Sequence, residues 1–121
     1  MNQDGILVVE DDTDIRESLR EALEDAGYRV TTARHGLEGL ERLATMNRPS
    51  LILLDLMMPV MSGPEFLDAL HEDDSISDIP VLIVSAYGDI ADETTGCVGF
   101  IPKPVPLDRL LDSVRRYSRA G

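Results

Sequence analysis

The chain has 121 residues, 43% of them hydrophobic and 28% charged, which predicts one globular domain with a buried core. Its formal net charge of −12 argues against direct binding of nucleic acid, and favours cationic partners such as a magnesium ion or a basic protein surface. The apolar runs are too short to span a bilayer, so we expect no membrane insertion. The start of the chain shows no signal-peptide pattern, and the single cysteine, Cys97, excludes an internal disulfide; both favour the cytoplasm.

The first predicted strand is the apolar run Ile6–Val9, and a helix follows it. Asp12 or Thr13 is the expected N-cap of this helix, because a short polar side chain can accept a hydrogen bond from the first turn. Apolar residues recur at helical spacing from Ile15 to Ala26, and Gly27 predicts where the helix stops.

The same alternation continues through the rest of the chain. The remaining predicted strands are, in order, Tyr28–Thr32, Leu51–Leu54, Val81–Val84 and Val98–Ile101. The remaining helices are predicted from Leu37–Ala44, Phe66–Leu70 and Leu107–Tyr117. Continuous apolar runs are typical of parallel strands covered on both faces, so five strands alternating with helices predict a doubly wound α/β sandwich.

The segment between Val84 and Val98 fits this pattern poorly. Glycines, threonines and aspartates dominate it, and these residues are weak helix formers. A fourth helix in this segment is therefore expected to be short or irregular.

Polar residues stand directly after several of the predicted strands. Glu10 and Asp11 follow the first strand, Asp55 the third and Ser85 the fourth, while Lys103, the only lysine of the chain, comes after the fifth. Ligands of an open parallel sheet bind beyond the carboxyl ends of its strands. If the first and third strands are neighbours, these groups converge on one crevice.

Such a cluster suits phosphoryl transfer. Carboxylates that share a site repel one another, and a hard divalent ion such as Mg²⁺ relieves the repulsion. One aspartate can then act as a nucleophile and form an aspartyl phosphate, whose charge the metal, a lysine and a hydroxyl stabilise. The alternative is that acids at strand ends only cap the next helix or are solvated, and that Lys103 is an accident of composition.

Four motifs in this order resemble the receiver domain of two-component response regulators over essentially the whole chain, residues 1–121. They are Val9-Glu10-Asp11-Asp12, Leu54-Asp55-Leu56-Met57-Met58-Pro59, Val84-Ser85-Ala86 and Phe100-x-x-Lys103-Pro104. The resemblance implies a flavodoxin-like fold with strand order 2-1-3-4-5 and helices on both faces.

The resemblance also implies roles for individual residues. Asp55 is expected to accept a phosphoryl group from a histidine kinase or a histidine phosphotransfer protein. Glu10, Asp11, Asp55 and the backbone carbonyl of Met57 are expected to hold Mg²⁺ (or Mn²⁺), Asp11 directly and Glu10 through water. Lys103 and Ser85 are expected to hold the phosphoryl oxygens.

Further expectations concern the output of the domain. In the family, the groups at the Ser85 and Phe100 positions move on phosphorylation, and the side chains at the Met57 and Tyr87 positions tune loss of the phosphoryl group. An apolar Met57 and a bulky Tyr87 predict slow self-dephosphorylation. The stretch from Ser85 to Lys103 is about one helical turn shorter than is usual, which favours signalling through the first helix or another unusual surface.

The sequence is best interpreted as a phosphoacceptor switch that catalyses only its own phosphorylation and dephosphorylation and acts on a downstream protein. Two alternatives are a small Mg²⁺-dependent phosphatase and a degenerate receiver that only binds proteins. The chain is expected to be a stand-alone regulator, a domain of a longer response regulator or the receiver of a hybrid kinase.

Overall fold

A computed structural model of the chain describes residues 5–46, 48–55, 61, 63–85 and 97–118. These residues form one five-stranded parallel sheet in the order β2-β1-β3-β4-β5. The strands are β1 (Gly5–Val9), β2 (Arg29–Ala33), β3 (Leu51–Asp55), β4 (Val81–Ser85) and β5 (Gly99–Pro102). The helices among the described residues are α1 (Thr13–Asp25), α2 (Gly36–Thr45), α3 (Gly63–Glu72) and α5 (Leu107–Ser118). The predicted strand order is confirmed, and the expected fourth helix falls on residues 86–96, outside the described ranges.

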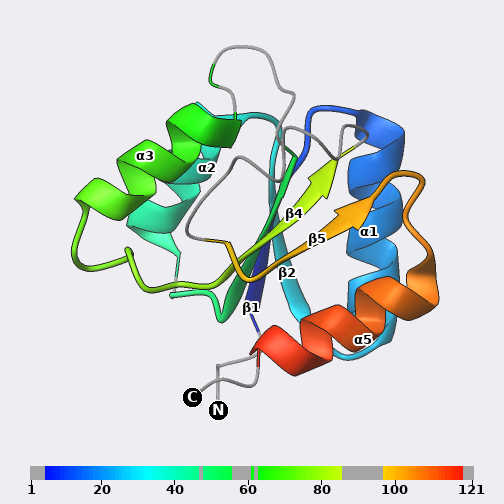
Figure 1. Cartoon of the computed structure of the whole chain (residues 1–121). Helices are drawn as coiled ribbons and strands as arrows, with labels where there is room; N and C mark the ends of the chain where they lie inside the picture. The colour runs from blue at the N-terminus through cyan, green and yellow to red at the C-terminus, as the bar shows by residue number, and fades with distance from the viewer. Residues whose placement is uncertain (1–4, 47, 56–60, 62, 86–96, 119–121) are drawn as a thin grey trace.

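The sheet is the middle layer of three. Helices α2 and α3 cover one face, and α1 and α5 cover the other (Figure 1). Every residue of β3 and β4 is buried, because both strands lie inside the sheet with helices on either side. The continuous apolar runs of the sequence therefore mark the central strands, as expected for a parallel sheet.

Helix α1 begins and ends as its sequence predicts. The Asp12 side chain accepts a hydrogen bond from the Ile15 N–H at 3.0 Å, which satisfies one of the free donors of the first turn. After the last residue of the helix, Gly27 takes a φ of 101°, a left-handed conformation that favours glycine. The chain can therefore reverse and enter β2.

The strand register aligns the polar ends of the strands. Val9 of β1 lies beside Leu54 of β3, so that Glu10 comes level with Asp55. On the other side of β3, Asp55 pairs with Val84 of β4, and Ser85 is the next residue along β4. Parallel pairing thus brings these three strand ends to the same edge of the sheet.

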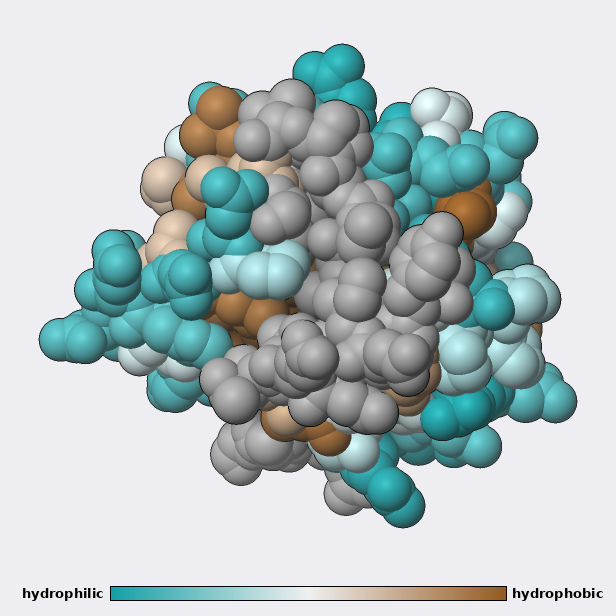
Figure 2. Space-filling view, turned by 45° about the horizontal axis from the view of Figure 1, so that its top comes forward, coloured by the Kyte–Doolittle hydropathy of each residue, from teal (hydrophilic) through white to brown (hydrophobic). Residues whose placement is uncertain are grey.

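The described surface visible in Figure 2 is mostly polar. Figure 2 shows hydrophilic side chains over most of the coloured surface, with the apolar ones in small separate areas. The exposed large hydrophobic residues among those described are Leu37, Val98 and Leu107. No described helix has the length and apolar character needed to cross a membrane.

Helix α2 approaches the core closely at Gly39. A Cβ atom added to Gly39 would lie 3.0 Å from Cε1 of Phe66 and 3.2 Å from Cγ2 of Val9. Both neighbours are buried, at 0% and 1% exposure, and neither is the free end of a flexible chain. The space at this position therefore admits only a hydrogen atom without rearrangement.

We predict that Gly39→Ala destabilises the protein by up to about 2 kcal/mol, because overpacking costs about 1–3 kcal/mol and the gain in helix propensity offsets only about 1 kcal/mol of it. The measurement is urea unfolding followed by circular dichroism. Ala44→Gly, at an exposed position of the same helix, is the matched control that reports propensity alone. A Gly39→Ala protein that is more stable than the wild type would contradict the packing argument.

Cys97 packs with Phe100 against the core between the sheet and helices α2 and α3. The thiol is half-buried, and this burial raises its pKa to about 11. A neutral thiol reacts slowly, because the thiolate is the nucleophile. Cys97 therefore behaves as a small apolar residue at neutral pH, in agreement with its place in the core.

We predict that iodoacetamide alkylates Cys97 slowly at pH 8 and that the rate keeps rising with pH up to about 11. Raising the thiol pKa from 9.0 to about 11 lowers the thiolate fraction at pH 8 about 100-fold. Mass spectrometry of the intact protein gives the rate, and guanidinium-unfolded protein is the control. A rate in the folded protein that levels off near pH 9 would rule out this burial effect.

Candidate functional site

Glu10 and Asp11 extend β1 beyond its last residue. The Glu10 N–H still pairs with the Ala33 carbonyl of β2 at 3.0 Å, so the sheet fixes where this segment begins. The Glu10 side chain turns inward and is 1% exposed, whereas Asp11 is exposed. Glu10 also accepts a hydrogen bond from the Asp12 N–H at 3.2 Å. The carboxylate of Glu10 therefore lies on the buried side of the site, and that of Asp11 lies on its solvent-exposed side.

Lys103 joins the ends of three strands. Its ammonium Nζ lies 2.9 Å from Glu10 Oε1 and 3.3 Å from Asp55 Oδ2. Both carboxylates are almost fully buried, and the lysine side chain is 17% exposed. The Lys103 N–H donates to the Ser85 carbonyl at 2.9 Å, which continues the β4–β5 ladder to the lysine itself. The only lysine of the chain is thus placed by the sheet against two buried acids.

Burial sets the electrostatics of this cluster. Desolvation raises the pKa of Glu10 to about 7, and the Asp55 charge adds to this effect, while Lys103 and the Asp12 N–H oppose it. Burial also disfavours the charge on Lys103, but its contacts with Glu10 and Asp55 outweigh that effect and raise the pKa of the lysine. The ammonium group of Lys103 therefore stays charged. Its single positive charge does not neutralise all of the neighbouring carboxylates.

The donor set fits a hard divalent cation. Glu10, Asp11 and Asp55 each offer a carboxylate oxygen, and these atoms lie within 4.8 Å of one another. The buried Glu10 Oε1 has no hydrogen-bond partner of good geometry among the described residues, although the lysine lies at ion-pair distance. Mg²⁺ prefers carboxylate oxygens together with water. The three acids match that preference.

The other predicted site residues take different places. Ser85 is fully buried at the end of β4, on the edge where Glu10 and Asp55 lie. Phe100 lies beside Ile83 in the β4–β5 register, two positions before the pair formed by Ser85 and Pro102. It is partly exposed and packs on the α2–α3 face, so it does not join the cluster. Met57 and Tyr87 lie outside the described residues, and their roles stay predictions.

One residue at the site has no part in the sequence-based prediction. Arg16 of α1 bends back and donates from Nη1 to the Glu10 carbonyl at 3.0 Å and to the Asp11 carbonyl at 3.4 Å. The sequence offers only a weak signal for this contact, because a cation near a helix N-terminus is unfavourable but its partner depends on the turn after β1.

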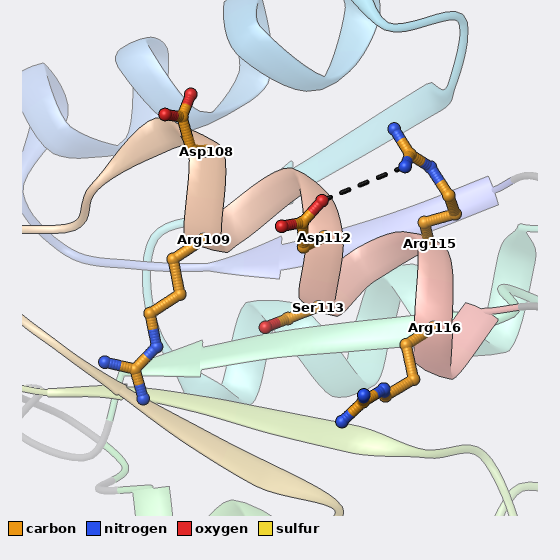
Figure 3. A pocket seen from close by; sticks show the side chains of 6 residues that line it. All are labelled: Asp108, Arg109, Asp112, Ser113, Arg115 and Arg116. Atoms are coloured by element: carbon orange, nitrogen blue, oxygen red, sulfur yellow. Dashed lines mark ion pairs between the residues drawn. The ribbon is translucent and has the colours of Figure 1, made fainter.

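Two surface hollows lie away from the carboxylates themselves. One of about 240 Å³ borders Lys103 and is lined mainly by apolar atoms of α1 and of the segment after β5. The other, of about 610 Å³, lies on α5, where Asp112 and Arg115 form an ion pair at 3.8 Å (Figure 3). Among the residues that the structure describes, those lining the α5 hollow all belong to that helix and none belongs to the carboxylate cluster.

Comparisons with known proteins agree with this geometry. The chain is 35% identical over 117 residues to the polar-differentiation response regulator DivK of Brucella anthropi, covering 93% of this chain and 94% of that protein. The Vibrio cholerae chemotaxis protein CheY4 superposes with a TM-score of 0.85 at 31% identity, covering 93% and 97% of the two chains. The response regulator TrrA of Thermotoga maritima, solved in complex with Mg²⁺-BeF, superposes with a TM-score of 0.83 at 30% identity, covering 93% and 97%.

The response regulator receiver domain is the family whose profile matches, over residues 6–115. The matched range contains all of the sheet except Gly5, the first residue of β1, and includes Glu10, Asp11, Asp55 and Lys103. The chain therefore belongs to the family of response regulator receiver domains, the phosphoacceptor signalling switches of two-component systems.

Proposed function

We propose that Asp55 is the residue of this switch that accepts the phosphoryl group. The observation that carries the proposal is the contact between its buried carboxylate and the Lys103 ammonium at 3.3 Å, beside Glu10 and Asp11. A carboxylate oxygen of Asp55 attacks phosphorus, and the bond from phosphorus to the donor breaks as the new P–O bond forms. The donor leaves with the electron pair of the broken bond.

Lys103 and Ser85 serve the same reaction. The ammonium is already at the edge of the cluster, where a phosphoryl oxygen on Asp55 would be its third anionic partner. Charge on the transferred group needs such fixed donors, because phosphoryl transfer depends on positioning and electrostatic stabilisation. Ser85 brings a hydroxyl to the same sheet edge. We infer that the chain catalyses its own phosphorylation and dephosphorylation and no further reaction.

A divalent ion completes the proposed site. Glu10, Asp11 and Asp55 would hold Mg²⁺ (or Mn²⁺), with Asp11 as the direct and Glu10 as the water-mediated ligand. When bound, the ion supplies positive charge to the phosphoryl oxygens. TrrA, which has the same fold and was solved in complex with Mg²⁺-BeF, supports the proposal of a bound Mg²⁺.

The partners follow from the family. Receiver domains interact with histidine kinases or phosphotransfer proteins and with downstream targets. We propose that a histidine kinase or a histidine phosphotransfer protein in the cytoplasm is the donor for this chain. Ser85 and Phe100 are the proposed switch residues. Ser85 lies at the end of β4 beside the cluster, and Phe100 lies on β5 opposite Ile83, two residues before Ser85 on β4.

The two other candidate functions are less well supported. A phosphatase would have to release phosphate repeatedly, and a degenerate receiver would lack part of the acid, hydroxyl and lysine set. The described residues bring Glu10, Asp55, Ser85 and Lys103 to one edge. Family membership favours the switch over the phosphatase, and the acid, hydroxyl and lysine set favours it over the degenerate receiver.

We predict that acetyl phosphate with Mg²⁺ adds a single phosphoryl group to the wild type and none to Asp55→Asn. Asparagine keeps the shape of the side chain but has no nucleophilic carboxylate. Intact-protein mass spectrometry measures the uptake. Asp108→Asn, the same change on an exposed residue of α5, is the control and should be phosphorylated like the wild type.

Two results would contradict this assignment. Phosphoryl uptake by Asp55→Asn at the wild-type rate would place the acceptor elsewhere. Repeated release of phosphate from p-nitrophenyl phosphate by the wild type, lost in Asp55→Asn, would instead support the phosphatase.

We predict that Asp11→Asn weakens Mg²⁺ binding by at least about tenfold, because it removes an oxygen anion from the metal site. Asp12→Asn is the matched control: it removes the same charge one residue away, lies outside the carboxylate cluster and keeps a good N-cap. Isothermal titration calorimetry with MgCl₂ compares the two. Equal losses in both variants would show that net charge, and not ligation, governs the affinity.

A further inference from the structure

The side chain of Arg16 runs backward along α1 to the end of β1. Its Nη1 donates to the Glu10 carbonyl at 3.0 Å and to the Asp11 carbonyl at 3.4 Å. Its Nη2 contacts the Thr13 hydroxyl at 3.4 Å. The planar guanidinium can span several acceptors at once, which a lysine ammonium on a mobile stem does less well. Arg16 thus links the first turn of the helix to the backbone of the two acids that precede it.

The backbone at Glu10 and Asp11 directs two successive side chains toward the same point. In a regular strand, successive side chains point to opposite faces of the sheet. Here the carboxylates of Glu10 and Asp11 approach one point, with oxygens within 4.8 Å of each other and of Asp55. The chain must therefore depart from regular strand geometry at Glu10, just after its N–H has made the last hydrogen bond to β2. The sheet holds the Glu10 N–H through Ala33, and Arg16 holds the carbonyl on the other side of the same residue.

The positive charge of Arg16 by itself should weaken the binding of a metal ion at the carboxylates. A guanidinium near a group of carboxylates lowers the local negative potential, so its removal should strengthen the binding of a cation. A benefit to metal binding can therefore come only from the geometry that Arg16 imposes. The two roles predict changes of opposite sign, which makes them separable by experiment.

We propose that Arg16 is a positioning residue for the metal site, which fixes the peptide groups of Glu10 and Asp11 so that both carboxylates face Asp55. The inference rests on the proposed function, since it takes the acid cluster to be the Mg²⁺ site. Arg16 touches neither the phosphoryl group nor the metal in this role. It acts through the main chain of the residues that do.

The test compares Arg16→Met with Arg20→Met. Methionine keeps an unbranched stem and a good helix propensity but donates no hydrogen bond. Arg20 lies one turn further along α1, where it pairs with Glu17 and Glu24 and not with the strand end. Each substitution removes one positive charge from the same helix. Far-UV circular dichroism and urea unfolding establish that both variants are folded.

Calorimetric titration with MgCl₂ is the primary measurement. We expect Arg16→Met to bind Mg²⁺ about tenfold more weakly than the wild type, the usual size of an effect transmitted through the supports of a ligand. Arg20→Met should bind as tightly as the wild type or slightly more tightly. Arg16→Lys should recover part of the loss, because its ammonium can donate to a carbonyl but lacks the planar fork.

Phosphorylation by acetyl phosphate gives a second measurement. Arg16→Met should need about tenfold more Mg²⁺ for half-maximal uptake, but at saturating Mg²⁺ its rate should return to within about twofold of the wild type. This split separates a weakened metal site from damage to Asp55 itself.

The outcomes distinguish the inference from the function on which it rests. Arg16→Met that binds Mg²⁺ as tightly as the wild type, or more tightly, overturns the positioning role while the proposed function stands. An equal loss in Arg20→Met also overturns it. If Arg16→Met is unfolded, Arg16→Lys decides: an affinity equal to or above that of the wild type rejects the role, and a partial loss of affinity supports it. Failure of the wild type to bind Mg²⁺ rejects the proposed metal site and the inference together.

Discussion

The ammonium group of Lys103, held between two buried carboxylates, is the interaction on which the rest of this structure depends. Glu10 and Asp55 are 1% and 4% exposed, and an unpaired buried charge costs several kcal/mol. One lysine cannot neutralise three neighbouring acids, so the arrangement is compensated only in part. Burial, and after it the charge of Asp55, raises the pKa of Glu10 to about 7 despite the contact with Lys103. The three carboxylates and their partial compensation fit the divalent ion proposed for this site.

Sequence reasoning predicted the sheet and the strand-end residues well, for a specific physical reason. In a parallel sheet all carboxyl ends share one edge, so residues that immediately follow buried strands come together whatever separates them in the chain. Glu10, Asp55 and Lys103 obey this rule, and the register confirms that β1 and β3 are neighbours. The chemical roles of these residues are inferences of a different kind. They depend on the donor set and its burial, which no strand pattern contains.

The contacts that the sequence did not predict depend on the path of one side chain or on a close approach of two elements. Arg16 reads as an ordinary surface cation of α1 until the turn after β1 is known, because only that turn brings two carbonyl oxygens within its reach. Gly39 reads as a weak point of α2 until its distance to Phe66 is known. Periodicity describes which face of an element is buried. It contains no information on how near the neighbouring element comes.

The residues of the site lie far apart in the sequence, which has a consequence during protein synthesis. The cluster is assembled from the first strand, the third strand and a lysine that follows the last strand, and its sheet order places β1 in the interior, beside β3. While a ribosome is still making the polypeptide, the early acids therefore lack their ammonium partner until nearly the whole domain has emerged. A nascent or truncated product that ends before Lys103 cannot build this cluster. Only a chain that extends past β5 therefore brings the ammonium group between the two buried carboxylates.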